Sequence, residues 1–350
     1  METTDFGKTP TGQTAKLFTL TNQQGMIAKV SNYGAALTEL HTPDRNGNLA
    51  DVTLGFPRLE GYLENAPFFG VVAGRYANRI AGGTFQLAGE TFRLAQNDGT
   101  NHLHGGTNGF NKKLWEPSSE VSDQAETLHL NYTSPDGEEG YPGKLKIQID
   151  YSLNDDGEFR IDYSATCDRP TPINLTNHAY WNLGGEASGS IGDHILTLNA
   201  SRYTPTDEAL IPTGLISAVE DGPLDFRQPE RIGERLHQTG LQPAGYDHNF
   251  VLTKTHVGAL ERAATVYHPP SGRTLEILTT EPGIQLYTAN FLDDQIIGKS
   301  GKPYGQHHGF CLECQHFPDS PNQAHFPSTI LPPGQTYRQT TIHRFTTKSQ

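Results

Sequence analysis

Residues 144–165 alternate strictly between apolar and polar side chains, and this pattern limits the possible folds more than any other part of the sequence. Between Lys144 and Leu153, Leu145, Ile147, Ile149 and Tyr151 alternate with Lys144, Lys146, Gln148 and Asp150. After a turn at 154–157, Phe159, Ile161 and Tyr163 repeat the pattern. Successive side chains of a β-strand point to opposite faces, so the period of two predicts two strands that each bury one face. The short turn predicts that they form an antiparallel hairpin.

Most of the remaining chain also has the sequence features of β-strands joined by turns. Residues 84–87 and 91–94 predict a second hairpin, and further stretches of period two lie at 127–132, 194–199, 274–279 and 283–290. One short helix is predicted at 229–236, where Pro229 is placed to open it. The 37 glycines and 23 prolines are spread along the chain, as expected for strands joined by turns. We therefore expect an all-β fold, a large antiparallel β-sandwich with few short helices, formed by residues 1–350 as a single domain.

The charge balance disfavours several classes of partner. The chain has 26 Lys and Arg against 39 Asp and Glu, a net charge of −13, and no basic cluster. These features disfavour binding to nucleic acid or to an anionic membrane surface. The N-terminus has no apolar signal region, no run of 18 apolar residues occurs, and the three cysteines are an odd number. We expect a cytoplasmic protein that is a monomer or homodimer.

The segment 174–183, NLTNHAYWNL, is dense in polar and aromatic side chains. In an extended backbone, His178 and Tyr180 share one face with Asn174 and Thr176, and Trp181 lies on the other. An imidazole, a phenol and an amide on one face suit a hydrogen-bonding pocket. A solvent-exposed strand end with a single stray histidine is the simpler interpretation of this segment taken alone.

Three other segments carry candidate groups. His102 and His104, in NHLHGG, point the same way in a strand, which is compatible with a metal, but zinc requires three or four donors. Gly105 and Gly106 favour a loop that lets a ligand or another backbone approach. The segment 74–80 has two arginines but lacks the pattern of a phosphate-binding loop. Asp247 precedes an apolar strand, where an acid is as often a turn residue as a ligand.

The segment 309–319, GFCLECQHFPD, contains either a C-x-x-C pair or a functional glutamate. In an extended strand, Cys311 and Glu313 face one way and Cys314 faces the other, so the two thiols diverge. A shared metal or a disulfide would need a turn between them. The cysteines are therefore better explained as small core residues, and Glu313 as a buried carboxyl whose pKa is raised by desolvation, as in many general bases.

Taken in order, these motifs resemble the aldose 1-epimerase (galactose mutarotase) family. The resemblance covers nearly the whole chain, from Gly34 to Tyr337. It rests on six motifs in family order: NRI (78–80), NHLHGG (101–106), TNHAYWNL (176–183), YDHNF (246–250), PGIQLYT (282–288) and LECQHFPDSPN (312–322). The fold of that family, a large antiparallel β-sandwich, agrees with the period-two pattern.

The resemblance implies a reaction and a role for each matching residue. Glu313 would be the general base that deprotonates the C1 hydroxyl of the sugar, and His178 the general acid that protonates the ring oxygen. The sugar hydroxyls would be bound by Asn78, Arg79, His104, Tyr180, Asp247 and Gln285. Trp181 could stack on the sugar or lie in the core. The substrate would be a small aldose, such as galactose or glucose, with no metal and no cofactor.

Several alternatives stay open from the sequence. A catalytically silent carbohydrate-binding protein would have no reason to combine Glu313 with His178. A glycoside hydrolase or lyase on a similar sandwich would need a second catalytic carboxylate, for which Asp247 is the candidate. A zinc or redox protein would use Cys311 and Cys314. A hexose-6-phosphate epimerase would need a basic pocket, and only Arg75 and Arg79 are near one another.

Overall fold

The structure, a computed structural model, describes residues 1–64, 67–121 and 126–349, and it is built mainly from three antiparallel sheets. The N-terminal sheet contains, in order, β1 (Glu2–Lys8), β2 (Thr14–Thr21), β3 (Ile27–Ser31), β4 (Ala36–Pro43) and β5 (Leu49–Asp51). The nine-stranded sheet has the order β11 (Glu116–Val121), β12 (Glu126–Ser134), β13 (Leu145–Leu153), β14 (Glu158–Cys167), β29 (Tyr337–Thr347), β23 (Arg273–Thr279), β22 (Glu261–Tyr267), β17 (Ile195–Leu198) and β20 (Glu230–Arg231). The third sheet has the order β19 (Ser217–Ala218), β18 (Ala200–Tyr203), β21 (Asp247–Leu252), β24 (Gly283–Tyr287) and β27 (Cys311–Gln315).

Smaller elements connect these sheets. The two-stranded ladders are β6 (Val72–Ala73) with β16 (Thr176–Asn177), β7 (Arg79–Ile80) with β10 (His102–Leu103), β8 (Thr84–Leu87) with β9 (Glu90–Arg93), β15 (Thr171–Pro172) with β28 (Ile330–Leu331), and β25 (Ile296–Ile297) with β26 (Pro303–Tyr304). In the part of the chain that the structure describes, the α-helices are α1 (Leu59–Leu63) and α2 (Ile232–Arg235), and five single 3₁₀ turns lie at 81–83, 110–112, 138–140, 236–238 and 320–322. No helix in the described residues is long and apolar enough to cross a membrane.

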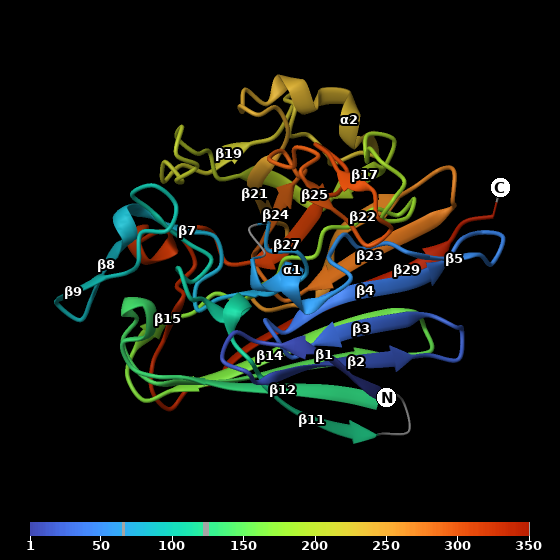
Figure 1. Cartoon of the computed structure of the whole chain (residues 1–350). Helices are drawn as coiled ribbons and strands as arrows, with labels where there is room; N and C mark the ends of the chain where they lie inside the picture. The colour runs from blue at the N-terminus through green and yellow to red at the C-terminus, as the bar shows by residue number, and fades with distance from the viewer. Residues whose placement is uncertain (65–66, 122–125, 350) are drawn as a thin grey trace.

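The hairpin predicted from alternation is formed by β13 and β14. Ile149 pairs with Tyr163 and Tyr151 with Ile161, and the apolar positions of both strands are buried while the polar ones are more exposed. Figure 1 shows the blue N-terminal strands lying along the green strands of the nine-stranded sheet. Between these two layers, the hydroxyl of Tyr151 donates a hydrogen bond to the carbonyl of Ala35 at 2.7 Å. The prediction of an all-β antiparallel sandwich is confirmed.

Side chains from all three sheets pack together in one hydrophobic core. Val30 of β3, Ile149 of β13 and Leu286 of β24 are fully buried members of the same cluster. Burying each such aliphatic side chain contributes about 1.5–3 kcal/mol relative to leaving it in water. The sheet that contains β24 is therefore fixed against the rest of the molecule, and it forms a rigid base for residues on its other face.

Three predicted elements are shorter than expected, and the strand predicted at 194–199 is β17 at 195–198. Helix α2 begins only at Ile232, three residues after Pro229, because Glu230 and Arg231 form the edge strand β20 and pair with β17. Strand β24 ends at Tyr287 instead of residue 290, and Ala289 has a φ of 52°, outside the extended region. The predicted hairpin of residues 84–94 is present as β8 and β9.

Candidate active site

A cavity of about 410 Å³ opens where one face of the third sheet meets the loops around Phe68, Asp98 and Phe291. Its volume lies in the range of small-molecule sites. It is lined by Pro67, Phe68, Asn78, Arg79, Asp98, Leu103, His104, His178, Tyr180, Asp247, Tyr287, Phe291, Leu292, Ile296 and Glu313. Seven of the eight predicted site residues are in this lining, and the eighth, Gln285, is buried beside them.

The third sheet places three predicted residues on one face. Gln285 of β24 is paired with Glu313 of β27, and Asp247 of β21 is paired with Tyr287, two residues along β24. Paired residues and residues two apart share a face, so Asp247, Gln285 and Glu313 point the same way. The amide Nε2 of Gln285 donates a hydrogen bond to Oδ1 of Asp247 at 2.6 Å. Gln285 therefore orients Asp247 from behind the lining.

Glu313 is a buried carboxyl, with 2% of its surface exposed. Burial raises its pKa well above its ordinary value, the charge of Asp247 adds to this effect, and the cation of Arg79 opposes it. Its Oε2 has no hydrogen-bond partner among the described residues. A buried carboxyl with a raised pKa in a cavity is a candidate general acid or base.

His178 approaches Glu313 from a different part of the chain. Its backbone is held between the carbonyl of Val71 and the N–H of Gly70, and its Nε2 lies 3.7 Å from Oε1 of Glu313. Its Nδ1 lies 3.6 Å from the sulfur of Cys311. Burial lowers the pKa of His178 to about 4. An imidazole and a carboxyl, both buried and separated by less than 4 Å, therefore face one cavity.

His104 faces the same cavity in a single tautomer. The backbone N–H of Asn78 donates to Nδ1 of His104 at 3.1 Å, so the proton of the neutral ring must lie on Nε2. Burial lowers the pKa of His104 well below its ordinary value, which keeps the ring neutral. Its ring centroid lies 5.1 Å from that of His178. His104 therefore presents an N–H donor to a ligand.

Arg79 supplies the positive charge of the cavity. Its Nε donates to Oδ2 of Asp98 at 2.7 Å, and 13% of its side chain is exposed. Burial raises the pKa of both Asp247 and Glu313, and the cation of Arg79 opposes this effect on each. Arg75, by contrast, is buried, and its guanidinium donates to the carbonyls of Pro142 and Gly143. The two arginines therefore form no phosphate pocket.

The expectation that His102 and His104 point the same way is wrong. His104 has a φ of 49°, which turns its side chain out of the strand direction. His102 is fully buried, where its Nδ1 contacts the carbonyl of Ala95 and its Nε2 the hydroxyl of Tyr141. The prediction for Gly105 is confirmed, because a Cβ there would lie 1.7 Å from the carbonyl oxygen of Gly74. The glycine allows two backbones to approach.

The alternation predicted for residues 178–181 is present. His178 and Tyr180 both line the cavity, and the hydroxyl of Tyr180 donates to the carbonyl of Pro67 at 2.9 Å. Trp181 lies in the hydrophobic core, with its ring centroid 5.1 Å from that of His343 and 5.6 Å from that of Phe345. Trp181 is therefore a core residue and does not contact the cavity.

Two groups among the described residues have the donor spacing of a metal site: His104 with His178 and Glu313, and Glu39 with His41 and Asp51. In the first group, Nε2 of His104 carries its proton and has no lone pair for a metal, which leaves only two ligands. In the second group, the carboxylates of Glu39 and Asp51 already bind the ammonium groups of Lys29 and Lys299. Both arrangements fit hydrogen bonding better than metal coordination.

Cys311 and Cys314 lie on opposite faces of β27, as predicted. Both are buried, and neither forms a disulfide. Cys314 belongs to the same core cluster as Leu286, whereas Cys311 packs in a second cluster with Tyr180 and Tyr287. The two sulfurs therefore cannot share one metal ion without rearrangement of the strand.

Part of the cavity wall was not predicted from the sequence. Phe68, Tyr287, Leu292 and Ile296 form an apolar side, and Phe291 stands at the rim with 60% of its surface exposed. Tyr287 falls on the polar face of β24 by alternation, so the sequence contains a signal for it. Phe68 has a φ of 63°, and the segment 291–296 has no regular secondary structure until β25. Such loop residues have no periodic signal.

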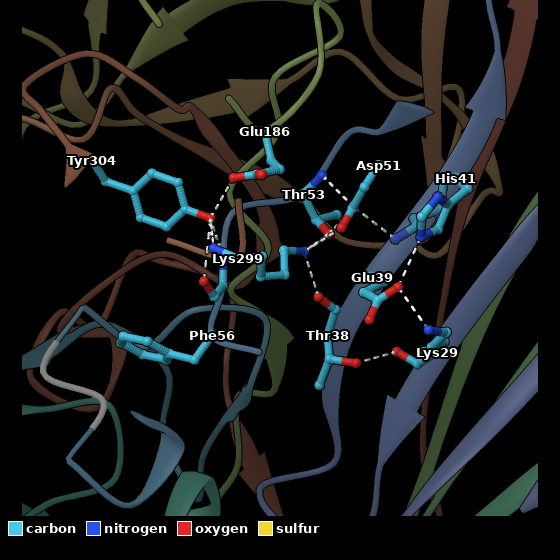
Figure 2. Close-up of polar contacts among 12 residues, drawn as sticks. Lys29, Thr38, Glu39, His41, Asp51, Thr53, Phe56, Glu186, Lys299 and Tyr304 are labelled. Carbon is cyan, nitrogen blue, oxygen red and sulfur yellow. Dashed lines mark hydrogen bonds and ion pairs between the residues drawn. The ribbon is translucent and has the colours of Figure 1, made fainter. Parts of the chain in front are cut away.

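The outer wall is anchored by a polar network at the tip of the hairpin β25–β26 (Figure 2). The ammonium of Lys299 pairs with Oδ2 of Asp51 at 2.5 Å and donates to the carbonyl of Thr38 at 2.7 Å and to Oγ1 of Thr53 at 3.2 Å. Only 9% of the Lys299 side chain and 13% of the Asp51 side chain are exposed. The hairpin that carries Ile296 is therefore fastened to the N-terminal sheet.

Lys299→Met is expected to lower the free energy of unfolding by about 3 kcal/mol, because removing one partner of a buried ion pair leaves the other charge unpaired. Urea denaturation followed by circular dichroism measures this change. Lys302→Met is the matched control, since Lys302 lies on the same hairpin but is exposed, and its effect should stay within about 0.5 kcal/mol. Equal effects of the two substitutions would contradict an anchoring role for Lys299.

Comparisons with known proteins agree with this geometry. The sequence model of the family described as aldose 1-epimerase matches residues 16–344. The chain is 47% identical over 343 residues to the galactose mutarotase of Bos taurus, covering 97% of each chain. The chain belongs to the aldose 1-epimerase family. It is also 36% identical over 340 residues to the aldose 1-epimerase of Escherichia coli, covering 96% of each.

Solved structures of aldose 1-epimerase relatives share the architecture. An aldose epimerase homologue from C. elegans matches with a TM-score of 0.87 and 31% identity over 96% of this chain and 100% of that one. The galactose 1-epimerase of Lactobacillus acidophilus matches with a TM-score of 0.86 and 28% identity over 99% of each. The resemblance inferred from six short motifs thus extends to the whole described fold.

Proposed function

We propose that this member of the aldose 1-epimerase family interconverts the α and β anomers of a free aldose such as D-galactose or D-glucose. The observation that carries the proposal is the 3.7 Å separation between Nε2 of His178 and Oε1 of Glu313 inside a cavity of suitable size. The close relatives are named galactose mutarotase, which supports the same reaction. No observation favours the hydrolase or silent-binding alternatives.

The reaction requires two coupled proton transfers. The carboxylate of Glu313 takes the proton from the C1 hydroxyl while the imidazolium of His178 gives a proton to the ring oxygen, and the bond between C1 and the ring oxygen breaks. The aldehyde then turns about the C1–C2 bond. Closure on the other face of the carbonyl, with both transfers reversed, produces the opposite anomer. No redox change and no leaving group is involved.

The proton count of the pair suits this cycle. Burial favours a protonated Glu313 and a neutral His178, since it raises the pKa of the first and lowers that of the second. This neutral pair holds one transferable proton, as does the pair of carboxylate and imidazolium, while the second imidazole nitrogen keeps its own proton. The neutral pair is the form that accompanies the open-chain aldehyde, and the charged pair accompanies the ring. The two forms differ only in which residue holds the proton, so the cycle needs no exchange of protons with solvent.

The sugar hydroxyls need fixed donors and acceptors, and the lining supplies both. Nε2–H of His104 and the guanidinium of Arg79 are donors, and Asp247, held by Gln285, is an acceptor. Asn78 and Tyr180 complete the proposed set, with the hydroxyl of Tyr180 able to accept while it donates to Pro67. Protein partners already hold these side chains in place. Sugar binding therefore costs little side-chain conformational entropy.

Polarimetry of freshly dissolved α-D-galactose and, in parallel, α-D-glucose tests the proposal. In a weak, non-catalytic buffer near pH 7, the protein should speed the approach to the final rotation without changing that rotation. A rate equal to the spontaneous one for both sugars, and for arabinose and xylose, would contradict the proposal and favour a silent binding protein. Heat-denatured protein at the same concentration controls for catalysis by buffer or free side chains.

Other expectations stay predictions: residues 1–350 as one domain, a cytoplasmic location, a role in hexose metabolism, and a monomer or homodimer that binds neither nucleic acid nor membranes. The proton transfers described above need no metal or cofactor, which is the basis for proposing that none is used.

A further inference from the structure

Cys311 contacts the proposed acid on the side away from the cavity. Its sulfur lies 3.6 Å from Nδ1 of His178, within the range of a hydrogen bond to sulfur. Cys311 is fully buried and precedes Glu313 by two residues on the same face of β27. One strand therefore contacts both nitrogens of His178, with Cys311 near Nδ1 and Glu313 near Nε2.

The direction of this hydrogen bond matters for the proton cycle. If Nε2 gives up and regains a proton, Nδ1 must keep its proton throughout, because a neutral imidazole carries one N–H. Nδ1–H then needs an acceptor. The backbone of His178 itself also hydrogen-bonds to the ring. The other side chains around the ring are Phe68, His104, Tyr180, Tyr287 and Glu313, and among the described residues Cys311 is the one whose side chain hydrogen-bonds to Nδ1.

We infer that Cys311 is a positioning residue whose sulfur accepts the hydrogen bond from Nδ1–H of His178 and thereby keeps Nε2 free to exchange a proton with the sugar. The kinetic part of this inference rests on the proposed function, and the tautomer part does not. A sulfur is a weaker acceptor than the carboxylate that often orients a histidine. It fixes the tautomer without adding a negative charge beside Glu313.

Two substitutions separate this role from simple packing. Cys311→Ala removes the side-chain acceptor, and Cys311→Ser replaces it with a hydroxyl. Cys314→Ala is the matched control, because Cys314 is a buried cysteine of the same strand that faces the core on the other side. A role limited to packing would give Cys311→Ala and Cys314→Ala similar effects on stability and none on the tautomer.

The tautomer of His178 can be measured directly by ¹⁵N-histidine NMR, with its signals assigned by their loss in His178→Asn. We expect Nδ1–H in the wild type, in Cys311→Ser and in Cys314→Ala. Cys311→Ala should populate the Nε2–H form. A wild-type protein with Nε2–H, or an unchanged tautomer in Cys311→Ala, would overturn the inference.

Kinetics supply the second readout. Cys311→Ala should lower kcat for galactose about 10-fold, the lower end for residues that orient a functional histidine, with KM within about twofold. Cys311→Ser should recover most of the loss, and Cys314→Ala should keep wild-type kcat. Wild-type kcat in Cys311→Ala would overturn the kinetic part. If the wild type proves inactive on every aldose, the proposed function fails, and the NMR result still decides whether Cys311 sets the tautomer.

Discussion

Glu313→Gln is expected to lower kcat for the interconversion of galactose anomers by a factor on the order of 10³, with little change in KM. Glutamine has nearly the same shape but cannot take the proton from the C1 hydroxyl. The reaction would then depend on water as the base, while the groups that bind the other hydroxyls stay in place. Polarimetry at saturating galactose, with the spontaneous rate subtracted, measures the change.

The stability of Glu313→Gln distinguishes a lost base from a damaged fold. The folded-state pKa of Glu313 lies well above its ordinary value of 4.5 because of burial. The protonated carboxyl of Glu313 therefore contributes fully to the free energy of unfolding below pH 4.5. This contribution is lost as the pH rises through the raised folded-state pKa. Glutamine never ionises, so the variant should unfold at the same or a higher temperature than the wild type at pH 8. Full kcat in a stable variant would exclude Glu313 as the base.

His178→Asn is expected to lower kcat by a factor on the order of 10² to 10³. Asparagine can donate a hydrogen bond to the ring oxygen but cannot transfer a proton to it, so ring opening would leave an unprotonated alkoxide. KM should change less, because the donors and acceptors of the proposed binding set are separate side chains. Progress curves over a range of galactose concentrations give both constants.

The pH dependence of unfolding provides an independent check on His178. Its folded-state pKa is about 4 because of burial, below the ordinary value of 6.5. The buried neutral imidazole contributes fully to the free energy of unfolding above pH 6.5. This contribution is lost as the pH falls from 6.5 towards 4. His178→Asn should therefore lose less stability than the wild type over this window in urea titrations. An equal loss would contradict the buried, neutral state of His178.

His102→Asn is the matched control for His178→Asn. His102 is also buried with a pKa lowered to about 4 by burial, but its ring bonds to Ala95 and Tyr141 and does not line the cavity. This control should lose stability and keep kcat within about threefold. A large loss of kcat in both variants would indicate that His178→Asn acts through the fold.

The sequence pattern predicted local features well. The period of two at 145–163 predicted a real hairpin with the correct buried face, and the same rule separated Cys311 from Cys314 and His178 from Trp181. Each of these predictions depends only on neighbours in one extended segment. The rule failed at His104, where a positive φ breaks the extended backbone.

By itself, the sequence determined the all-β class, the hairpin of residues 145–163 with its buried face, and which family the motifs resemble, because these depend on local backbone geometry and on order along the chain. Only the tertiary structure decided that His178 lies 3.7 Å from Glu313, that Asn78 sets the tautomer of His104, and that Lys299 anchors the cavity wall. These contacts join distant segments through loops whose conformations leave no period in the sequence, and packing of the whole core fixes them.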